Sequence, residues 1–517
     1  MTHSKIERIL LQDETTIHQL MKTEEALNLN TDVTSISVSA SQKPNGIFLS
    51  ALPSSIFGDP GFCNTYRTKY AFYAGAMANA IASVDMVIAL GRQGMMGSFG
   101  AAGLVRSKLE TAVDQIQKAL PDGPYAFNLI NSPYEESLER NAVEVYLAKK
   151  VRVIEASAYL TMSPTLVWYR AAGLSKNPDG SVMIGNHIIA KVSRNEVAAK
   201  FMEPAAEKML TQLVSEGRIT SEQAELARLV PMADDITVEG DSGGHTDNRP
   251  LVCLLPTMLA LRDEMQRKYN YAQPVRIGAG GGISTPSSVL GAFMMGAAYV
   301  VTGSINQACV ESGASKHTKE LLAQIGMADV AMAPSADMFE MGVKVQVLKR
   351  GTMFYIRASK LYEIYSKYDS IETIPLDERE KLETQIFQRK MDDIWQETIR
   401  FFKERDPRQI EQAEKNPKKK MALVFRWYLG LSSRWSNSGE PGREMDYQIW
   451  CGPSMGSFND WARSTYLAQP ENRHVADVTA HLFAGAAWQY RVQQLKLSGF
   501  DLPARYQNYY PEVPLIE

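Results

Sequence analysis

Two stretches near the middle of the chain decide the predicted fold: VRIGAGGGIS at residues 275–284 and AYVVTG at residues 298–303. Each begins as a short apolar run, typical of a strand buried on both faces, and each runs into glycine. Between them, residues 286–296 have the composition of a short helix that starts at a proline, a residue tolerated at the first helical position. This strand–helix–strand pattern predicts two neighbouring parallel strands.

Six similar apolar runs precede these two, with helical stretches between them. The runs are YAFYAG (70–75), GMMGSF (94–99), YAFNLI (125–130), VRVIEA (151–156), IIAKVS (188–193) and DITVEG (235–240). The helices are expected at 83–92, 105–120, 134–150, 164–172, 196–217 and 251–269. Eight strands alternating with helices over about 260 residues predict a (β/α)8 TIM barrel. The alternative is a doubly wound open sheet, which would bind its ligand where the strand order reverses.

The chain has 517 residues, too many for one simple barrel. Residues 335–430 have apolar side chains three and four positions apart, which predicts amphipathic helices. A glycine- and aromatic-rich loop is expected at 430–461 and a closing helix near 473–497. The predicted domains are an N-terminal leader (1–60), a barrel (61–334), a mostly helical accessory or substrate domain (335–470) and a C-terminal helix with a tail (471–517).

Composition excludes several classes of protein. A formal net charge of −3 provides no strong basic field for nucleic acid. The 4 cysteines are scattered without zinc-binding spacing, so no metal site is expected and a reducing compartment is favoured. The charged N-terminus lacks the apolar core of a signal peptide, and no uninterrupted apolar run is long enough to span a membrane. We expect a soluble cytoplasmic protein.

The segment VEGDSGGHTDNRP (238–250) follows the sixth predicted strand, at the barrel end where active sites form. Gly243 and Gly244 would let the backbone approach a flat ligand closely, with Asp241 and His245 as polar neighbours. A histidine with a purely structural hydrogen bond is the alternative. The same letters match the Gly-x-Ser-x-Gly elbow of serine hydrolases, but two glycines follow the serine directly and a proline delays the next helix.

Glycine-rich turns follow the seventh and eighth predicted strands. Their backbone N–H groups and the following helix starts favour a bound phosphate monoester, and barrels often hold phosphate at this place. The candidate residues are Gly280, Gly281, Gly282, Gly303 and Ser304. The dinucleotide fingerprint fails because Ile283 occupies the position of its third glycine. Glycines that serve only the turns are the alternative.

Other predicted strand ends carry residues suited to a ring-shaped cofactor. Ala76 and Met77 follow the first strand and could form a flat bed, although core packing alone also explains a methionine. Asn128, Glu155 and Lys191 place polar groups at the ends of the third, fourth and fifth strands, as a flavin would require. A lysine beside a flavin would stabilise the reduced anionic ring, whereas a simple pair between Lys191 and Glu155 is the alternative.

Several long motifs resemble one known family. They are GDSGGHTDNRP (240–250), YAGAMANAIAS (73–83), GSFGAAGL (97–104), ADMFEMGVKVQVLKRG (336–351), MALVFRWYLGLSSRW (421–435) and DYQIWCGPSMGSFNDW (446–461). With these motifs the chain resembles the PfaD-type trans-acting enoyl reductases of polyunsaturated fatty acid and trans-acyltransferase polyketide synthases. That family lies within the superfamily of FMN-dependent nitronate monooxygenases and FabK-like reductases. The resemblance extends over about residues 51–497.

The resemblance implies an FMN-bearing barrel that uses NADPH to reduce the 2,3 double bond of an enoyl thioester on an acyl carrier protein. The glycines after the seventh and eighth strands, with Ser304, would hold the FMN phosphate. The ring would be lined by Met77, Asn128 and Lys191 and approached by Gly243 and Gly244. His245 matches the histidine of the family's SGGH motif and would give a proton or hydrogen bond to the enolate, with solvent as the alternative donor.

Some alternatives stay open at this point. A nitronate monooxygenase would share the barrel and FMN but use dioxygen, and a non-catalytic flavin-binding subunit of a synthase would perform no reaction. The preference for NADPH over NADH, the acyl chain length and a homodimeric state are not determined by the sequence. Basic residues that could dock an acidic carrier protein, or else form solvated helix faces, are Lys344, Lys349, Arg350, Lys418, Lys419 and Lys420.

Overall fold

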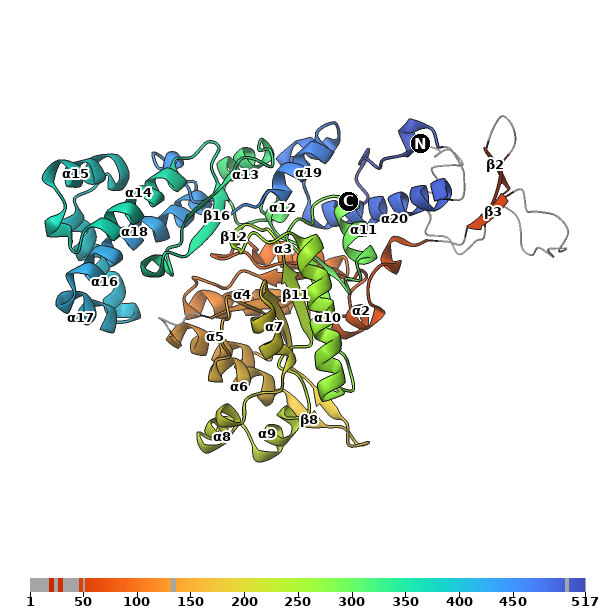
Figure 1. Ribbon diagram of the computed structural model, residues 1–517, viewed down its shortest axis with the longest axis horizontal. Helices are drawn as coiled ribbons and strands as arrows, with labels where there is room; N and C mark the ends of the chain where they lie inside the picture. The colour runs from red at the N-terminus through yellow and green to blue at the C-terminus, as the bar shows by residue number, and fades with distance from the viewer. Residues whose placement is uncertain are drawn as a thin grey trace.

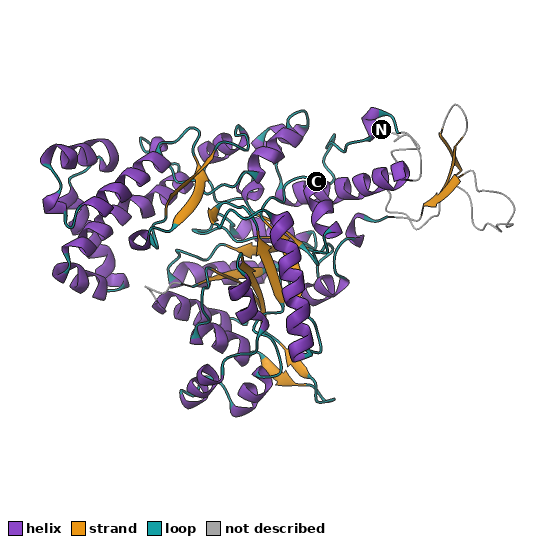
Figure 2. Cartoon of the chain, in the orientation of Figure 1, coloured by secondary structure: helices purple, strands orange, loops and turns teal. Residues whose placement is uncertain are grey.

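A computed structural model of the chain describes residues 18–22, 27–30, 46–49, 52–131, 136–497 and 502–516. Parallel strands close into a barrel at the centre of the molecule, surrounded by helices (Figures 1 and 2). The strands are β4 (Phe72–Ala74), β5 (Met96–Phe99), β6 (Ala126–Ile130), β7 (Val153–Ser157), β10 (His187–Val192), β11 (Asp235–Glu239), β13 (Arg276–Gly280) and β14 (Val300–Thr302). Strand β14 pairs with β4 and closes the ring. The predicted TIM barrel is confirmed, each strand overlaps its predicted run, and the open sheet is excluded.

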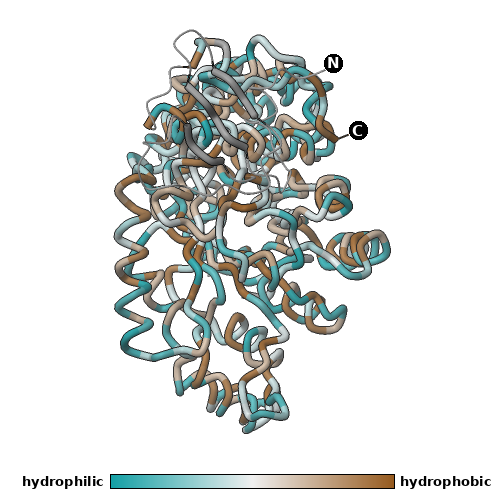
Figure 3. Tube along the Cα trace, turned by 90° about the vertical axis from the view of Figure 1, so that its right-hand side faces the viewer, coloured by the Kyte–Doolittle hydropathy of each residue, from teal (hydrophilic) through white to brown (hydrophobic). Residues whose placement is uncertain are grey.

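Amphipathic helices form the outer layer, and hydrophobic and hydrophilic segments alternate along them in Figure 3. They are α3 (Val84–Arg92), α4 (Arg106–Ala119), α5 (Glu136–Ala148), α6 (Pro164–Ala172), α7 (Asn195–Met202), α10 (Leu251–Tyr269) and α11 (Pro286–Met294). The single helix predicted over 196–217 is wrong. Helix α7 ends before Pro204 and α8 (Glu207–Ser215) begins after it, because proline cannot continue a helix interior. A further helix, α9 (Ser221–Ala227), precedes β11.

Helix α20 (Val475–Leu497) returns from the far end of the chain and takes the last place around the barrel. It packs against α11 and α3 (Figure 1). The ring centroid of Phe483 lies 4.6 Å from that of Tyr70, and a Cβ on Gly485 would lie 2.4 Å from Cγ of Pro286. The predicted closing helix is confirmed, and it packs onto the same core as the barrel strands.

Between β14 and α20 the chain leaves the barrel and forms a second core. We call residues 304–474 the excursion. It begins with α12 (Ser304–Gln307) and α13 (Lys316–Ala323), followed by strands β15 (Val330–Pro334) and β16 (Lys344–Leu348). These two strands pair with each other, and β16 also pairs with β12 (Gly244–His245) from the barrel mouth. The purely helical prediction for 335–430 is therefore wrong at β16, where buried Val345 and Val347 alternate with Gln346 on the opposite face.

Helices complete the excursion, and all but the last of them lie beside the barrel on the left of Figure 1. They are α14 (Phe354–Lys367), α15 (Leu376–Lys381), α16 (Met391–Arg405), α17 (Arg408–Lys415), α18 (Pro417–Ser438) and α19 (Ser454–Ala462). The loop predicted at 430–461 is wrong at both ends, because α18 continues to Ser438 and α19 begins at Ser454. None of the described helices combines the length and hydrophobicity that a bilayer crossing requires.

Most of the predicted leader, residues 1–60, lies outside the described residues. Three short strands within it, β1 (His18–Lys22), β2 (Leu27–Asn30) and β3 (Gly46–Leu49), pair as an antiparallel sheet. Helix α2 (Pro60–Tyr66) follows, and its buried Phe62 and Tyr66 pack beneath the barrel, where the ring of Phe62 stacks on Tyr299 at 4.3 Å. Helix α2 therefore closes the end of the barrel opposite the mouth.

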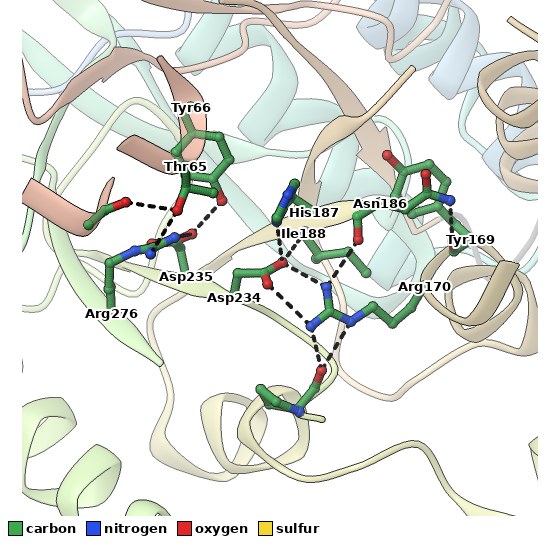
Figure 4. Close-up of polar contacts among 12 residues, drawn as sticks. Thr65, Tyr66, Tyr169, Arg170, Asn186, His187, Ile188, Asp234, Asp235 and Arg276 are labelled. Carbon is green, nitrogen blue, oxygen red and sulfur yellow. Dashed lines mark hydrogen bonds and ion pairs between the residues drawn. The ribbon is translucent and has the colours of Figure 1, made fainter. Parts of the chain in front are cut away.

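Two buried ion pairs hold the amino-terminal ends of the strands together (Figure 4). Arg276 of β13 binds Asp235 of β11 through Nε and Oδ1 at 2.6 Å, and the hydroxyl of Tyr66 donates to the same carboxylate. Arg170 binds the neighbouring Asp234 at 2.7 Å. Burial alone would raise the pKa of Asp234, but the charges of Arg170 and His187 outweigh it and hold that pKa well below its usual range.

We expect Asp235→Ala to destabilise the protein by about 3–5 kcal/mol, because it leaves the charge of Arg276 buried without its carboxylate. Asp263→Ala is the matched control, since its partner Arg262 and its own side chain lie at the surface, with 25% and 55% exposure. That exposed pair contributes at most about 1 kcal/mol. Urea denaturation followed by tryptophan fluorescence measures both changes, and equal losses would contradict the structural role of the buried pair.

Candidate functional site

A cavity of about 690 Å³ lies between the carboxyl ends of the barrel strands and the excursion. Its size falls within the range of small-molecule and cofactor pockets. The predicted site residues that line it are Ala76, Met77, Asn128, Lys191, Gly243, Gly244, His245, Gly280, Gly281, Gly282, Gly303 and Ser304. Glu155 and Asp241 do not line the cavity. One continuous space thus brings together residues from β4 to β14, as the mouth of a barrel should.

The glycine turns after β13 and β14 leave open space in the cavity. Gly281 and Gly282 both have left-handed backbone, with φ of 78° and 79°. A Cβ on Gly281 would lie 2.7 Å from the carbonyl carbon of Gly240, so this glycine serves backbone packing. A Cβ on Gly282 or on Gly303 would meet no atom within 4 Å. These two positions face unfilled space that a phosphate could occupy.

Polar groups in α12 border the same space. Backbone N–H of Gly452 donates to Oγ of Ser304 at 3.0 Å, which leaves the Ser304 hydroxyl hydrogen available for an acceptor in the cavity. Gln307 is buried, and its Nε2 has no hydrogen-bond partner within the described part of the chain. A buried amide donor without a partner is costly, and a bound acceptor would satisfy it.

Lys191, at the end of β10, lies between two carboxylates. Its Nζ is 3.2 Å from Oε1 of Glu239 and 4.0 Å from Oε1 of Glu155. Burial lowers the pKa of Lys191, but the two carboxylate charges outweigh burial and raise it above the usual value. Lys191 is therefore a fixed cation at the barrel mouth. The predicted pair with Glu155 exists, but Glu239 is the nearer partner.

Glu155 lies fully buried beneath the cavity floor. Backbone N–H of Ala76 donates to its Oε2 at 2.8 Å, whereas its Oε1 has no hydrogen-bond partner among the described residues. Asn128 donates from Nδ2 to the backbone oxygen of Glu155 at 3.1 Å and to Oγ of Ser157 at 2.9 Å. These contacts fix the loop after β4 and the side chain of Asn128, so the floor of the cavity is rigidly built.

His245 lies on the opposite wall, at the end of β12. Its Nε2 is 3.2 Å from Oδ1 of Asp337, which comes from the turn before β16. Burial lowers the pKa of His245, but the hydrogen bond to Asp337 and the charges of Asp337 and Glu239 outweigh burial and raise it. The same contact lowers the pKa of Asp337 to about 2, against the effect of burial. The imidazole is 39% exposed and so remains accessible from the cavity.

The geometry around Ser242 does not match a hydrolase elbow. Its Oγ donates to Oε1 of Glu239 at 2.9 Å, whereas His245 binds Asp337. Helix α10 begins only at Leu251, so Ser242 does not lie on a sharp strand-to-helix turn. The hydrolase alternative therefore lacks its base and its turn.

The outer wall of the cavity comes from one face each of two excursion helices. The lining residues of α16 recur at helical spacing, as do those of α18. They are Glu397, Thr398, Phe401, Phe402 and Arg405 in α16, and Leu423, Arg426, Trp427, Leu429, Gly430, Leu431, Ser433 and Arg434 in α18. The cavity thus has a polar floor and a wall in which apolar side chains alternate with polar and charged ones.

A close backbone contact joins the loop after β11 to the segment before α19. A Cβ on Gly243 would lie 2.8 Å from the backbone nitrogen of Cys451, and a Cβ on Gly452 would lie 2.9 Å from the backbone nitrogen of Gly243. Gln346 of β16 reinforces the contact by donating from Nε2 to Oδ1 of Asp241 and to the backbone oxygen of Ser242, each at 2.7 Å. Asp241 therefore helps to hold the excursion against the barrel.

Most of the predicted docking cations are engaged within the protein. Nζ of Lys418 donates to the backbone oxygens of Tyr365 and Tyr368. Nζ of Lys419 lies 2.8 Å from Glu340, that of Lys420 lies 3.4 Å from Glu372, and Arg350 lies 3.6 Å from Asp329. Lys344 lines the cavity. The three consecutive lysines thus make contacts within the protein.

Sequence reasoning missed several residues of the site. Glu239 ends β11, so the rule that selected Asn128, Glu155 and Lys191 at other strand ends could have found it. Asp337 and Gln346 lie in one of the quoted motifs, but nothing local indicated their partners, which lie 92 and about 105 residues away, and the region was expected to be helical. Gly452 lies in a motif, but its role follows only from the backbone contact with Gly243.

Comparison with known proteins gives two family matches. The family described as nitronate monooxygenase matches residues 62–368, and the inserted helical domain of [acyl-carrier-protein] S-malonyltransferase matches residues 368–447. The boundary between the matches falls near the end of α14. The first match includes every strand of the barrel and the β15–β16 pair.

Three relatives show the extent of the similarity. One component of the polyunsaturated fatty acid synthase of Thraustochytrium sp. is 51% identical over 85% of this chain, which spans 30% of that component. Polyketide biosynthesis protein PksE of Bacillus subtilis is 44% identical over 87% of this chain and 58% of its own length. The crystal structure of the enoyl reductase domain of MlnA from Bacillus amyloliquefaciens matches 86% of this chain and 100% of that domain, with 41% identity and a TM-score of 0.82.

We expect Gly243→Ala to destabilise the protein by about 1–3 kcal/mol, because the new methyl group would collide with the backbone of Cys451. The control is Gly291→Ala in α11, where a Cβ meets no atom within 4 Å. Alanine in a helix interior stabilises by about 0.5–1 kcal/mol relative to glycine, so the control should melt at the same temperature or higher. Thermal melting compares the two, and an unchanged melting temperature for Gly243→Ala would refute the tight contact.

Proposed function

Because the chain belongs to the nitronate monooxygenase family, we propose that its cavity binds FMN and that the protein is an NADPH-dependent reductase of enoyl thioesters carried on an acyl carrier protein. The observation that carries this proposal is that one cavity has a glycine-lined cradle and a fixed cation at its floor, while α16 and α18 contribute apolar side chains to its wall. The 41% identity with the enoyl reductase domain of MlnA supports reduction as the reaction. The match of residues 368–447 to a domain of an acyl-carrier-protein transferase supports a carrier-bound substrate.

The residues present fit a flavin mononucleotide. The open positions at Gly282 and Gly303, the hydroxyl of Ser304 and the unpartnered Nε2 of Gln307 are suited to a phosphate and its ribityl chain. Met77 and Asn128 would line the ring, with Gly244 approaching it from the loop after β11. When bound, the flavin would supply hydride transfer from NADPH to the β-carbon of the enoyl thioester.

Lys191 would stabilise negative charge at the barrel mouth. Two carboxylates hold its ammonium group in place, so its orientation requires no rearrangement when charge develops nearby. Its raised pKa keeps it protonated at neutral pH. In this role Glu239 and Glu155 are positioning residues that act through Lys191.

His245 would supply the proton that completes the reduction. Addition of hydride at the β-carbon leaves an enolate, which needs one proton at the α-carbon to give the saturated thioester. The raised pKa of His245 increases the protonated fraction near neutral pH, and Asp337 orients the ring through Nε2. The apolar side chains of Phe401, Phe402 and Trp427 would receive the acyl chain and limit access of water.

Anaerobic titration tests the reaction directly. We expect a yellow preparation that bleaches on addition of NADPH and recovers its colour on addition of crotonyl thioester. Colour that does not bleach with NADPH, but bleaches with a nitronate and recovers with dioxygen, would assign monooxygenase activity instead. A protein that stays colourless after incubation with FMN would refute the cofactor, and bleaching without recovery by any enoyl thioester would refute the substrate class.

The pH dependence tests the pair of His245 and Asp337. Asp337 raises the pKa of His245, so the rate should fall as pH rises through that raised value and the imidazolium is lost. In Asp337→Asn the carboxylate charge is absent and the pKa falls, so the alkaline limb of the kcat profile should move to lower pH. A profile that does not move would contradict proton donation by this pair.

His245→Ala separates the two halves of the reaction. We expect kcat for enoyl reduction to fall by about 10²–10⁴-fold, the usual contribution of a general acid. Bleaching of the flavin by NADPH alone should keep its rate, measured by stopped-flow absorbance. Loss of that first half-reaction would place His245 in NADPH binding or flavin reduction and would refute a role confined to protonation.

A further inference from the structure

Cations that line the cavity fall into two groups. In the first, each has a carboxylate partner: Lys191 lies 3.2 Å from Glu239, Arg194 lies 2.8 Å from Asp247, and Arg426 lies 3.4 Å from Glu340. Such pairs are internally neutral and leave little net charge for a ligand. They account for three of the lysines and arginines that line the cavity, and the others are Lys344, Arg405 and Arg434.

Arg434 of α18 belongs to the second group. Its side chain lines the cavity, and no carboxylate within the described ranges forms an ion pair with it. Ser433 beside it accepts a hydrogen bond from Nδ2 of Asn79 at 3.1 Å, so this turn of α18 is held to the loop after β4. The helix turn that carries Arg434 is therefore held where the excursion meets the barrel.

A second arginine of the cavity lies near enough to repel it. Arg405, the last residue of α16, lines the same cavity, and α16 packs directly against α18. Burial and the charge of Arg405 both lower the pKa of Arg434, although a guanidinium stays protonated throughout the accessible pH range. A bound anion beside Arg434 would offset this repulsion.

We propose that Arg434 binds a phosphate ester of the substrate or of the hydride donor as it enters the cavity. The planar guanidinium presents paired N–H donors that match phosphate oxygens. This subsite is distinct from the glycine cradle at Gly282 and Gly303, which belongs to loops on the barrel. It rests on the proposed function, which brings two phosphate esters to the cavity: the phosphodiester of a phosphopantetheine thioester and the 2′-phosphate of NADPH.

Direct binding tests this subsite without turnover. The FMN-loaded protein is titrated by calorimetry with 4′-phosphopantetheine and with pantetheine, and separately with adenosine 2′,5′-bisphosphate and with adenosine 5′-monophosphate. We expect Arg434→Gln to weaken the binding of either 4′-phosphopantetheine or adenosine 2′,5′-bisphosphate by about tenfold or more, as loss of a charge-assisted hydrogen bond does. The affinity for the matching probe without that phosphate, pantetheine or adenosine 5′-monophosphate, should not change. A change in the phosphopantetheine pair would assign the phosphate to the substrate, and a change in the adenosine pair would assign it to the hydride donor. If neither pair responds, the proposal is refuted whether or not the protein is an enoyl reductase.

Steady-state kinetics provides the second arm. If the phosphopantetheine is bound, Arg434→Gln should raise KM for crotonyl-CoA but not for the crotonyl thioester of N-acetylcysteamine. If the 2′-phosphate is bound, the variant should raise KM for NADPH but not for NADH. Arg434→Lys keeps the charge without the planar donors and should give an intermediate effect. Equal changes for both members of each pair would refute a phosphate contact.

A matched control removes an arginine elsewhere. Arg463 follows α19, is 78% exposed and forms an ion pair with Asp460. Arg463→Gln should leave every binding and kinetic constant unchanged. The flavin absorbance spectrum and melting temperature of Arg434→Gln must equal those of the control, and Arg434→Lys keeps the test valid if Arg434→Gln fails to fold.

Discussion

The backbone of residues 451–452 lies so close to that of residues 242–243 that a side chain at Gly243 or Gly452 would collide with it. The rest of the mouth depends on this contact. It places β16 beside β12, so that Asp337 reaches His245, and it brings the N–H of Gly452 to Ser304 beside the glycine cradle. A loop of the barrel and a segment some 200 residues later in the chain thereby form one wall of one cavity.

Ion pairs serve different purposes at the two ends of the barrel. At the closed end, Asp235 is fully buried and its partner Arg276 is sealed beneath α2, so the pair fastens β11 to β13. At the open end, Lys191 and His245 are held by carboxylates but remain partly exposed to the cavity. Attraction of the same kind stabilises the fold at the closed end, whereas at the open end it raises the pKa of Lys191 and of His245, where a ligand can reach both groups.

Local sequence signals predicted the barrel because each buried parallel strand is a short apolar run, which can be recognised without knowing which distant residues it contacts. The same signals selected Lys191 and His245, since the carboxyl ends of successive strands must meet at one mouth. They failed at β16, whose five residues are too few to outweigh the helical pattern around them. They also could not pair His245 with Asp337 or Gly243 with Gly452, because only the folded chain brings these partners together.

The way in which the excursion is attached argues for a fixed wall over the cavity. It leaves the barrel after β14 and returns as α20, which packs between α11 and α3 as part of the outer layer. Between these two ends it is held again by β12–β16 pairing, by the contact at Gly243 and by the bond from Asn79 to Ser433. A segment anchored at several separate points cannot swing away without breaking partly buried hydrogen bonds. The side chains of α16 and α18 therefore form a fixed part of the cavity lining, which a barrel alone does not possess.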